Sequence, residues 1–131
     1  MPESGIYAMR QALRRQRMAI KAGDRPGFYA ADTDFHAAPI EALRLTVTLG
    51  ILRVLGPHVE RARRQCTLTD GLKAQTMAEH EAVVEAMERR DAETASGAMS
   101  AHLQSVSDRF EAAVSQRPWL FTTRRANGAP E

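Results

Sequence analysis

The chain has 131 residues and a formal net charge of +2, and it is 44% hydrophobic, 26% charged and 5% aromatic. This length suits one hydrophobic core, and the many Ala, Arg, Glu, Leu and Met residues favour an all-α fold, an antiparallel helical bundle. The arginine pairs are scattered, which argues against a nucleic-acid surface, and a single cysteine cannot form an internal disulfide. The chain lacks a run of ~18 apolar residues, which argues against a membrane-spanning helix. We therefore expect a cytoplasmic protein.

The first two helices follow from apolar periodicity and from the turn between them. A helix is predicted from about Gly5 to Ala22, because its apolar side chains recur every three or four residues. Gly23 ends this helix, and a second helix should run from about Pro26 or Gly27 to Ala42. Pro39 lacks the N–H of one helical hydrogen bond, so we expect a kink or an early end there.

The third region, from about Leu43 to Gln65, is the most apolar part of the chain. Its stretch from Leu45 to Leu55 is interrupted by few polar residues, and it is typical of a buried core helix. The Gly56-Pro57 pair should bend or divide this helix.

Two more helices are predicted in the second half of the chain. Thr69 or Asp70 is a suitable N-cap for a fourth helix that ends near Arg90. Asp91 should cap a fifth helix from Ala92 to about Gln116, which Pro118 closes. We expect one helical domain over residues 1–121, followed by a flexible tail over residues 122–131 without apolar periodicity.

Four polar side chains occupy positions that the helical periodicity assigns to the core. Asp32 and His36 are four residues apart in the second helix and therefore share one face. His80 lies in the middle of the apolar stripe of the fourth helix, and His102 does so in the fifth. Burying each group alone would be costly, and a shared cation would remove that cost.

Three imidazoles and one carboxylate form a set of metal ligands. Such a set suits a divalent ion, with Zn favoured and Ni, Mn, Fe or Co as alternatives. In an octahedral site it leaves two positions for water or an anionic ligand. The site predicted from Asp32, His36, His80 and His102 can therefore bind a small molecule as well as stabilise the fold.

Each of these histidines also has a purely structural interpretation. A lone histidine on an apolar stripe is more often a satisfied core residue than a metal ligand, and stripe position alone does not cleanly reject His58. Because His58 directly follows Gly56-Pro57, we interpret it as structural or partly exposed. Asp34 is out of phase with Asp32 and should face solvent.

The motifs together resemble the FCD domain, the effector-binding C-terminal domain of FadR-type GntR transcriptional regulators. The residues that carry this resemblance are Gly23-Asp24, Phe28, Asp32-Thr33-Asp34-Phe35-His36, Glu79-His80, Ala86, Asp91 and Ala101-His102-Leu103. The resemblance implies a bundle of six or seven antiparallel helices that is usually dimeric. It also implies a metal held by the same four residues, which helps to bind a small carboxylate.

The sequence departs from that family's pattern in ways that bear on function. We expect this chain to lack the winged helix-turn-helix that normally precedes the domain, and also the domain's own first helix, so that DNA binding would require a domain absent from this chain. Arg44 and Arg53 interrupt the apolar third helix and are the candidates for binding an effector carboxylate, although a surface position suits both better.

The function predicted from these features is that of a metal-dependent sensor of small carboxylates, a homodimer and not an enzyme. One alternative is a metal-dependent enzyme on a helical bundle, and another is a structural or dimerisation remnant of a truncated regulator. Di-iron bundles use Glu-x-x-His motifs, whereas three residues before His36, His80 and His102 stand Thr33, Met77 and Met99.

Overall fold

The structure, a computed structural model, describes residues 1–66 and 70–120. This part of the chain is helical throughout and contains no strand, which confirms the predicted all-α fold. The elements are α1 (Glu3–Ala22), α2 (Arg25–Ala42), α3 (Thr46–Cys66), α4 (Asp70–Glu88), α5 (Ala92–Gln116) and a short 3₁₀ helix, η1 (Pro118–Leu120).

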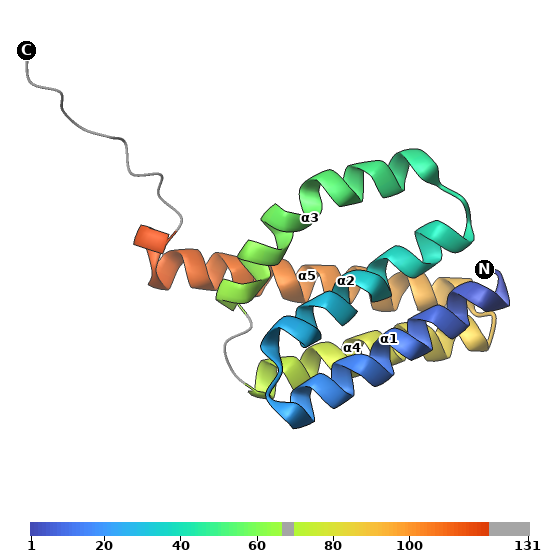
Figure 1. Ribbon diagram of the computed structural model, residues 1–131, viewed down its shortest axis with the longest axis horizontal. Helices are drawn as coiled ribbons and strands as arrows, with labels where there is room; N and C mark the ends of the chain where they lie inside the picture. Colours follow the sequence, from blue (N-terminus) through green and yellow to red (C-terminus); the bar gives the residue numbers. More distant parts are fainter. Residues whose placement is uncertain (67–69, 121–131) are drawn as a thin grey trace, which may run out of the picture.

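Successive helices run in alternating directions along the long axis of the molecule (Figure 1). Helix α1 packs against α2 and α4, and α4 packs against α5. Helix α3 contacts α2 and α5 and arches along the upper edge of the view (Figure 1). The fold is thus a four-helix bundle of α1, α2, α4 and α5 with α3 at its margin. Within the described residues, no helix is long and apolar enough to cross a membrane.

A tight turn joins α1 to α2 and sets their antiparallel packing. Gly23 adopts a left-handed conformation with φ 66°, which costs glycine little, and the Asp24 N–H donates back to the Ala19 carbonyl at 2.9 Å. The Asp24 side chain then accepts from the Gly27 N–H at 3.0 Å, which caps α2. At the other end of this helix pair, Gly5 of α1 lies so close to Ala42 that a Cβ at Gly5 would be 2.7 Å from the Ala42 Cβ.

The core lies between these four helices and is mainly aliphatic. Its buried members are Met9, Ala12, Leu13, Ala19, Phe28, Tyr29, Phe35, Ala38, Met77, Val83 and Val84. Buried polar side chains lie among them, namely Gln16, Asp32, Lys73, Thr76, His80 and His102. Because a buried polar group needs a hydrogen-bond partner, this second set shows where polar interactions, in addition to apolar packing, organise the core.

The helix limits agree with the prediction most closely in α5, where Asp91 accepts from the Thr94 N–H at 3.0 Å and the helix spans Ala92–Gln116 as expected. Helix α2 continues through Pro39 to Ala42. The backbone hydrogen bonding goes on after the proline, because the Leu43 N–H donates to the Pro39 carbonyl at 3.1 Å. Helix α3 is not divided at Pro57. The predicted cap Thr69 and the tail over residues 122–131 lie outside the described residues.

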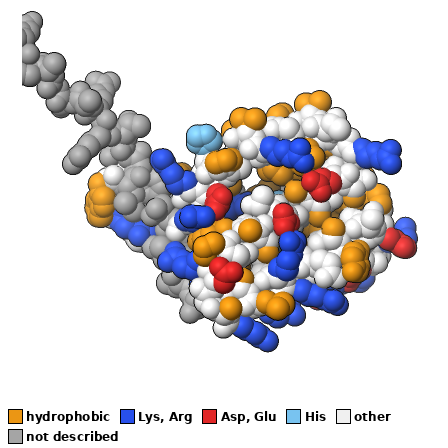
Figure 2. Space-filling view, viewed as in Figure 1, with side chains coloured by type: hydrophobic (Ala, Val, Ile, Leu, Met, Phe, Trp, Pro, Cys, Tyr) orange, Lys and Arg blue, Asp and Glu red, His pale blue; other side chains and the backbone are white. Residues whose placement is uncertain are grey.

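The expectation that residues 45–55 form a buried core helix is wrong. Helix α3 forms there, but its contacts with α2 and α5 are less extensive than those among the other helices, so much of its apolar surface is left uncovered. The exposed side chains of this region are Leu43, Leu45, Val47, Ile51, Val54, Leu55 and Val59. Hydrophobic side chains are visible along the same upper edge of the space-filling view (Figure 2).

Candidate metal centre

Three helices bring the predicted metal ligands to one point in the bundle. Asp32 and His36 come from consecutive turns of α2, His80 from α4 and His102 from α5. One ring nitrogen from each histidine lies within 4.8 Å of the others. His80 and His102 are 0% and 1% exposed, and His36 is mostly buried.

The spacing of the inward-facing atoms suits a shared ion. The Nε2 atoms of His80 and His102 are 3.3 Å apart, and the Asp32 Oδ1 lies 3.7 Å from the His80 Nε2 and 4.0 Å from the His36 Nε2. Two ligand atoms that are each ~2.1 Å from one metal ion are separated by ~3.0 Å at right angles and ~4.2 Å when opposite. The three distances fall in this range.

Hydrogen bonds on the outer side of the rings decide which nitrogens face the centre. The Gln16 Nε2 donates to Asp32 Oδ1 at 3.2 Å, which turns its Oε1 towards the His80 Nδ1 at 3.2 Å. The His80 Nδ1 must therefore donate. The His102 Nδ1 donates to the Glu79 Oε2 at 2.8 Å, because a carboxylate only accepts.

In the neutral rings this arrangement leaves the Nε2 atoms of His80 and His102 without protons, so their lone pairs face each other. The Asp32 Oδ1 adds a further acceptor. The His36 Nε2 is buried and, among the described residues, has no hydrogen-bond partner. One ring nitrogen from each of the three histidines thus faces the same point, with an Asp32 oxygen beside two of them, so the residues present fit a metal ion.

The electrostatic surroundings favour the neutral, metal-binding form of His36 and His80. Burial is the largest cause and lowers the pKa of His36 to about 3, and the positive charge of Arg63 acts in the same direction. Burial also lowers the pKa of His80 to about 3, although the Asp32 carboxylate acts against it. Both rings are neutral at pH 7, as ligation requires.

Glu79 positions His102 and belongs to a larger polar network. It accepts from Ser105 at 2.7 Å and pairs with Arg109 at 3.1 Å. Burial alone would raise the pKa of Glu79, but the hydrogen bonds from His102 and Ser105 and the charge of Arg109 hold that pKa below its usual value. The carboxylate is therefore ionised and fixes the tautomer of His102.

Gln16 and Glu79 contact the histidines, although the sequence patterns assigned no role at the site to either of them. Gln16 lies three residues after Leu13 and seven after Met9, so the periodicity that selected the histidines also places it on the buried stripe of α1. Glu79 precedes His80 and points away from its helix's core stripe, and only the packing of α5 against α4 shows its contact with His102.

The remaining candidates take different positions. His58 is exposed on α3, and Asp34 faces solvent and pairs with Arg15 at 2.8 Å, as expected for both. Arg44 is exposed in the α2–α3 turn, and Arg53 is an exposed residue 3.8 Å from Glu41, so the structure brings neither to the histidines. The arginine that reaches the site is Arg63 of α3, whose Nη1 pairs with the Asp32 Oδ2.

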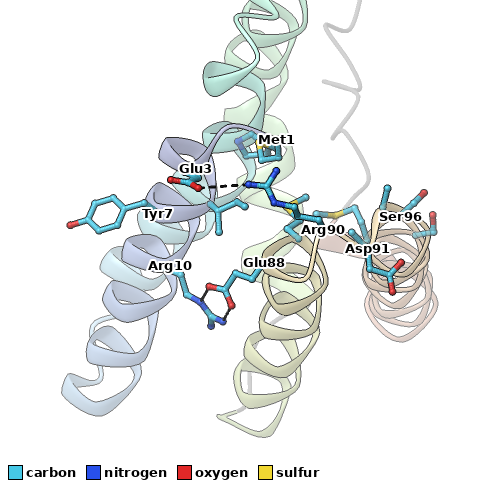
Figure 3. A pocket seen from close by; sticks show the side chains of 15 residues that line it. Met1, Glu3, Tyr7, Arg10, Glu88, Arg90, Asp91 and Ser96 are labelled. Atoms are coloured by element: carbon cyan, nitrogen blue, oxygen red, sulfur yellow. Dashed lines mark hydrogen bonds and ion pairs between the residues drawn. The ribbon is translucent and has the colours of Figure 1, made fainter.

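A small cavity of about 20 Å³ adjoins His102 and Asp32 and has Arg63 and Arg109 at its walls. A much larger open groove, of about 960 Å³, lies elsewhere, between the start of α1, the end of α4 and the start of α5. Figure 3 shows ion pairs along it, from Arg10 to Glu88 and from Glu3 to Arg90. Its walls are mainly apolar and carry none of the predicted metal ligands, so size alone does not identify the functional site.

Comparison with known proteins identifies the family of the chain. Residues 1–105 match the FCD domain family. The chain belongs to this family. This match confirms the resemblance to the FCD domain that was inferred from the sequence motifs.

Curated relatives of this FCD domain are longer regulators. The chain is 26% identical over 106 residues, or 81% of its length, to the HTH-type transcriptional repressor RspR of Escherichia coli K12. The same identity and coverage hold for the uncharacterized HTH-type transcriptional regulator YdfH of Shigella flexneri. The match covers 46% of each relative, so the chain spans about half the length of the curated proteins that it resembles. No solved structure matches the chain significantly.

Proposed function

We propose that the chain is the metal-dependent, small-carboxylate-sensing domain of a GntR-type transcriptional regulator. In this proposal Asp32, His36, His80 and His102 bind one divalent cation, with Zn favoured. The observation that carries it is the convergence of three histidine ring nitrogens beside the Asp32 carboxylate, with the buried His36 Nε2 lacking a hydrogen-bond partner among the described residues. DNA would be contacted by a helix-turn-helix domain of the kind named in the relatives.

Sensing suits this site better than catalysis. A hydrolase that activates a metal-bound water needs a free general base nearby. Glu79 is engaged by His102, Ser105 and Arg109, and Glu81 pairs with Arg17 at the surface. The carboxylates beside His80 are therefore committed to structure, whereas a metal with open positions suffices to bind an anionic effector.

Metal binding is tested by thermal unfolding of the full chain with EDTA and with added Zn²⁺. At a free Zn²⁺ concentration about a thousand times Kd, binding stabilises the folded state by ~4 kcal/mol, which raises Tm by about 10 °C or more. The variant His36→Gln should lose this shift, while its unfolding in EDTA changes little because the His36 Nε2 has no hydrogen bond to lose.

His58→Gln is the matched control, since it removes an exposed histidine outside the cluster. It should keep the full Zn²⁺ shift. The proposal fails if the wild type binds no stoichiometric metal, or if His36→Gln and His58→Gln respond to Zn²⁺ alike.

A homodimer through α3 completes the proposed assembly. The exposed side chains Val47, Ile51, Val54, Leu55 and Val59 recur every three or four residues and form one apolar stripe along the helix. Such a stripe can pair with itself about a two-fold axis, which buries apolar surface in both copies. Light scattering should give a dimer for the wild type and a folded monomer for Ile51→Asp, and an unchanged mass for this variant would rule α3 out as the interface.

A further inference from the structure

Arg63 occupies an unusual position for an arginine of this chain. It lies near the end of α3, and its guanidinium pairs with the Asp32 Oδ2, while the other oxygen of the same carboxylate faces the histidines. The side chain is 20% exposed, against 72% for Arg53 on the same helix. One residue thus links a marginal helix to the centre of the bundle.

The small cavity beside the histidines has two guanidinium groups at its walls, and they differ in their freedom. Arg109 is fully engaged, because its Nε donates to the Ser105 carbonyl at 2.9 Å, its Nη1 to Thr76 at 3.0 Å and its Nη2 to Glu79 at 3.1 Å. Arg63 has Asp32 as its one recorded partner in the part of the chain that the structure describes, through Nη1. Its Nε and Nη2 can therefore donate to a ligand.

The balance of charge at the site calls for an anion once a cation is present. A divalent ion contributes two positive charges, Asp32 contributes one negative charge and Arg63 contributes one positive charge, so the net charge of these three groups is two positive charges. Arg109 and Glu79 cancel each other. Two uncompensated positive charges among side chains that are nearly buried are costly, and a ligand with two negative charges removes this cost.

We propose that Arg63 is the anion-binding residue of this site and that it makes the site selective for small dicarboxylates over monocarboxylates and neutral amides. The planar guanidinium matches a carboxylate through two parallel N–H donors. The cavity holds about 20 Å³, so the Arg63 side chain must swing outward to admit such a ligand. Its partly exposed position at the edge of the bundle allows this movement. The inference rests on the proposed metal site.

The test uses the full chain loaded with Co²⁺, whose visible absorption reports on its ligands, together with calorimetric titration. The probes are malonate, acetate and malonamide. Wild-type protein should bind malonate at least tenfold more tightly than acetate, malonamide should not bind, and malonate should change the Co²⁺ spectrum.

Arg63→Gln should bind Co²⁺ at least as tightly as the wild type but weaken malonate binding about tenfold or more and reduce the preference over acetate. Arg63→Lys keeps the charge and should lie in between. Arg61→Gln, an exposed arginine of the same helix, is the matched control and should behave as the wild type.

The outcomes separate this inference from the proposed function. Wild-type protein that binds no Co²⁺ would overturn both. Wild-type protein that binds Co²⁺ but no malonate, or an Arg63→Gln variant that binds malonate with unchanged affinity and selectivity, would overturn the role of Arg63 and leave the metal site standing. If Arg63→Gln does not fold, Arg63→Lys decides, because malonate affinity and selectivity over acetate equal to those of the wild type and of Arg61→Gln would contradict the proposal.

Discussion

Phe35 on α2 is 0% exposed and stacks on His80 with ring centroids 4.0 Å apart, whereas Val54 on α3 leaves 73% of its surface in solvent. Both are apolar residues of α-helices, yet only one of them is covered. Helix α1 packs closely against α2, and α4 packs closely against α5, whereas α3 makes less extensive contacts with its neighbours α2 and α5. The bundle holds the candidate metal centre, and α3 approaches it through Arg63.

This difference separates residues that build the site from residues left available for other contacts. The bundle surrounds the histidines with Phe35, Gln16 and Glu79, so their positions follow from packing and hydrogen bonds. Helix α3 is tied to α2 by the Arg63–Asp32 ion pair and by Arg64, whose guanidinium lies 5.5 Å from the Tyr29 ring centroid. A rearrangement of the side chains at the candidate metal centre can therefore be transmitted to α3 through few contacts. The exposed apolar stripe makes α3 the suitable helix to contact a second copy of the chain.

The largest expected effect comes from comparing the two apolar residues directly. Phe35→Ala should lower the free energy of unfolding by about 3–5 kcal/mol in EDTA at every protein concentration, because it empties a site inside the core. Val54→Ala should destabilise only at concentrations where the dimer forms, since the single chain leaves Val54 exposed. Urea unfolding at several protein concentrations measures both.

Phe35→Leu is the milder control and should lose less stability than Phe35→Ala, because it leaves a smaller cavity. A large loss in Val54→Ala that does not depend on concentration would mean that α3 is buried within the single chain. The contrast between the two regions would then be false.

A smaller effect is expected at glycines of the two regions. A Cβ at Gly5 would lie 2.7 Å from the Ala42 Cβ, so Gly5→Ala should force α1 from α2 and cost about 1–3 kcal/mol, partly offset by better helix propensity. Gly50 on α3 has no atom within 4 Å of such a Cβ, so Gly50→Ala should stabilise by up to about 1 kcal/mol. Thermal unfolding of both variants measures the difference, and equal signs would contradict it.

The smallest effect is expected at the bundle surface. Arg10 donates to Glu88 at 2.7 and 2.6 Å, and this contact lowers the pKa of the Glu88 carboxyl. A carboxyl with a lower pKa in the folded state stabilises fully above its unfolded pKa, near ~4.3, and this stabilisation is lost as the pH falls through the folded pKa. Glu88→Gln should thus cost at most about 0.5 kcal/mol at pH 7 and nothing near pH 2, as measured by urea unfolding at both pH values. A cost that persists near pH 2 would show that the variant disturbs more than the ion pair.

Much of the site could be predicted because its signal is local. Asp32 and His36 share a helix face by their spacing, and His80 and His102 fall on apolar stripes, so periodicity alone selected all four. The caps behave in the same way, since Asp91 and Gly23 act on backbone groups a few residues away. Such features depend on residues that are close together along the chain and can therefore be predicted from the sequence.

Residues that act across helices were not predictable in this way. The contact of Glu79 with His102 and the reach of Arg63 to Asp32 depend on how α4 meets α5 and how α3 crosses α2. Arg44 and Arg53 were chosen because they interrupt an apolar helix, a criterion that does not tell which of its arginines points inward. Gln16 is the intermediate case, because its place on the α1 stripe predicts burial but not its partners.

The sequence by itself therefore determined the helices, their turns and the four polar side chains that must be accommodated inside the bundle, because these depend on periodicity and on short-range backbone bonding. Only the tertiary structure decided which side chains surround those four and that the most apolar stretch of the chain stays uncovered. The hydrophobicity of a side chain indicates how much free energy its burial would contribute, but burial also requires another surface that packs against it. For the apolar stripe on α3, no other helix among the described residues provides such a surface.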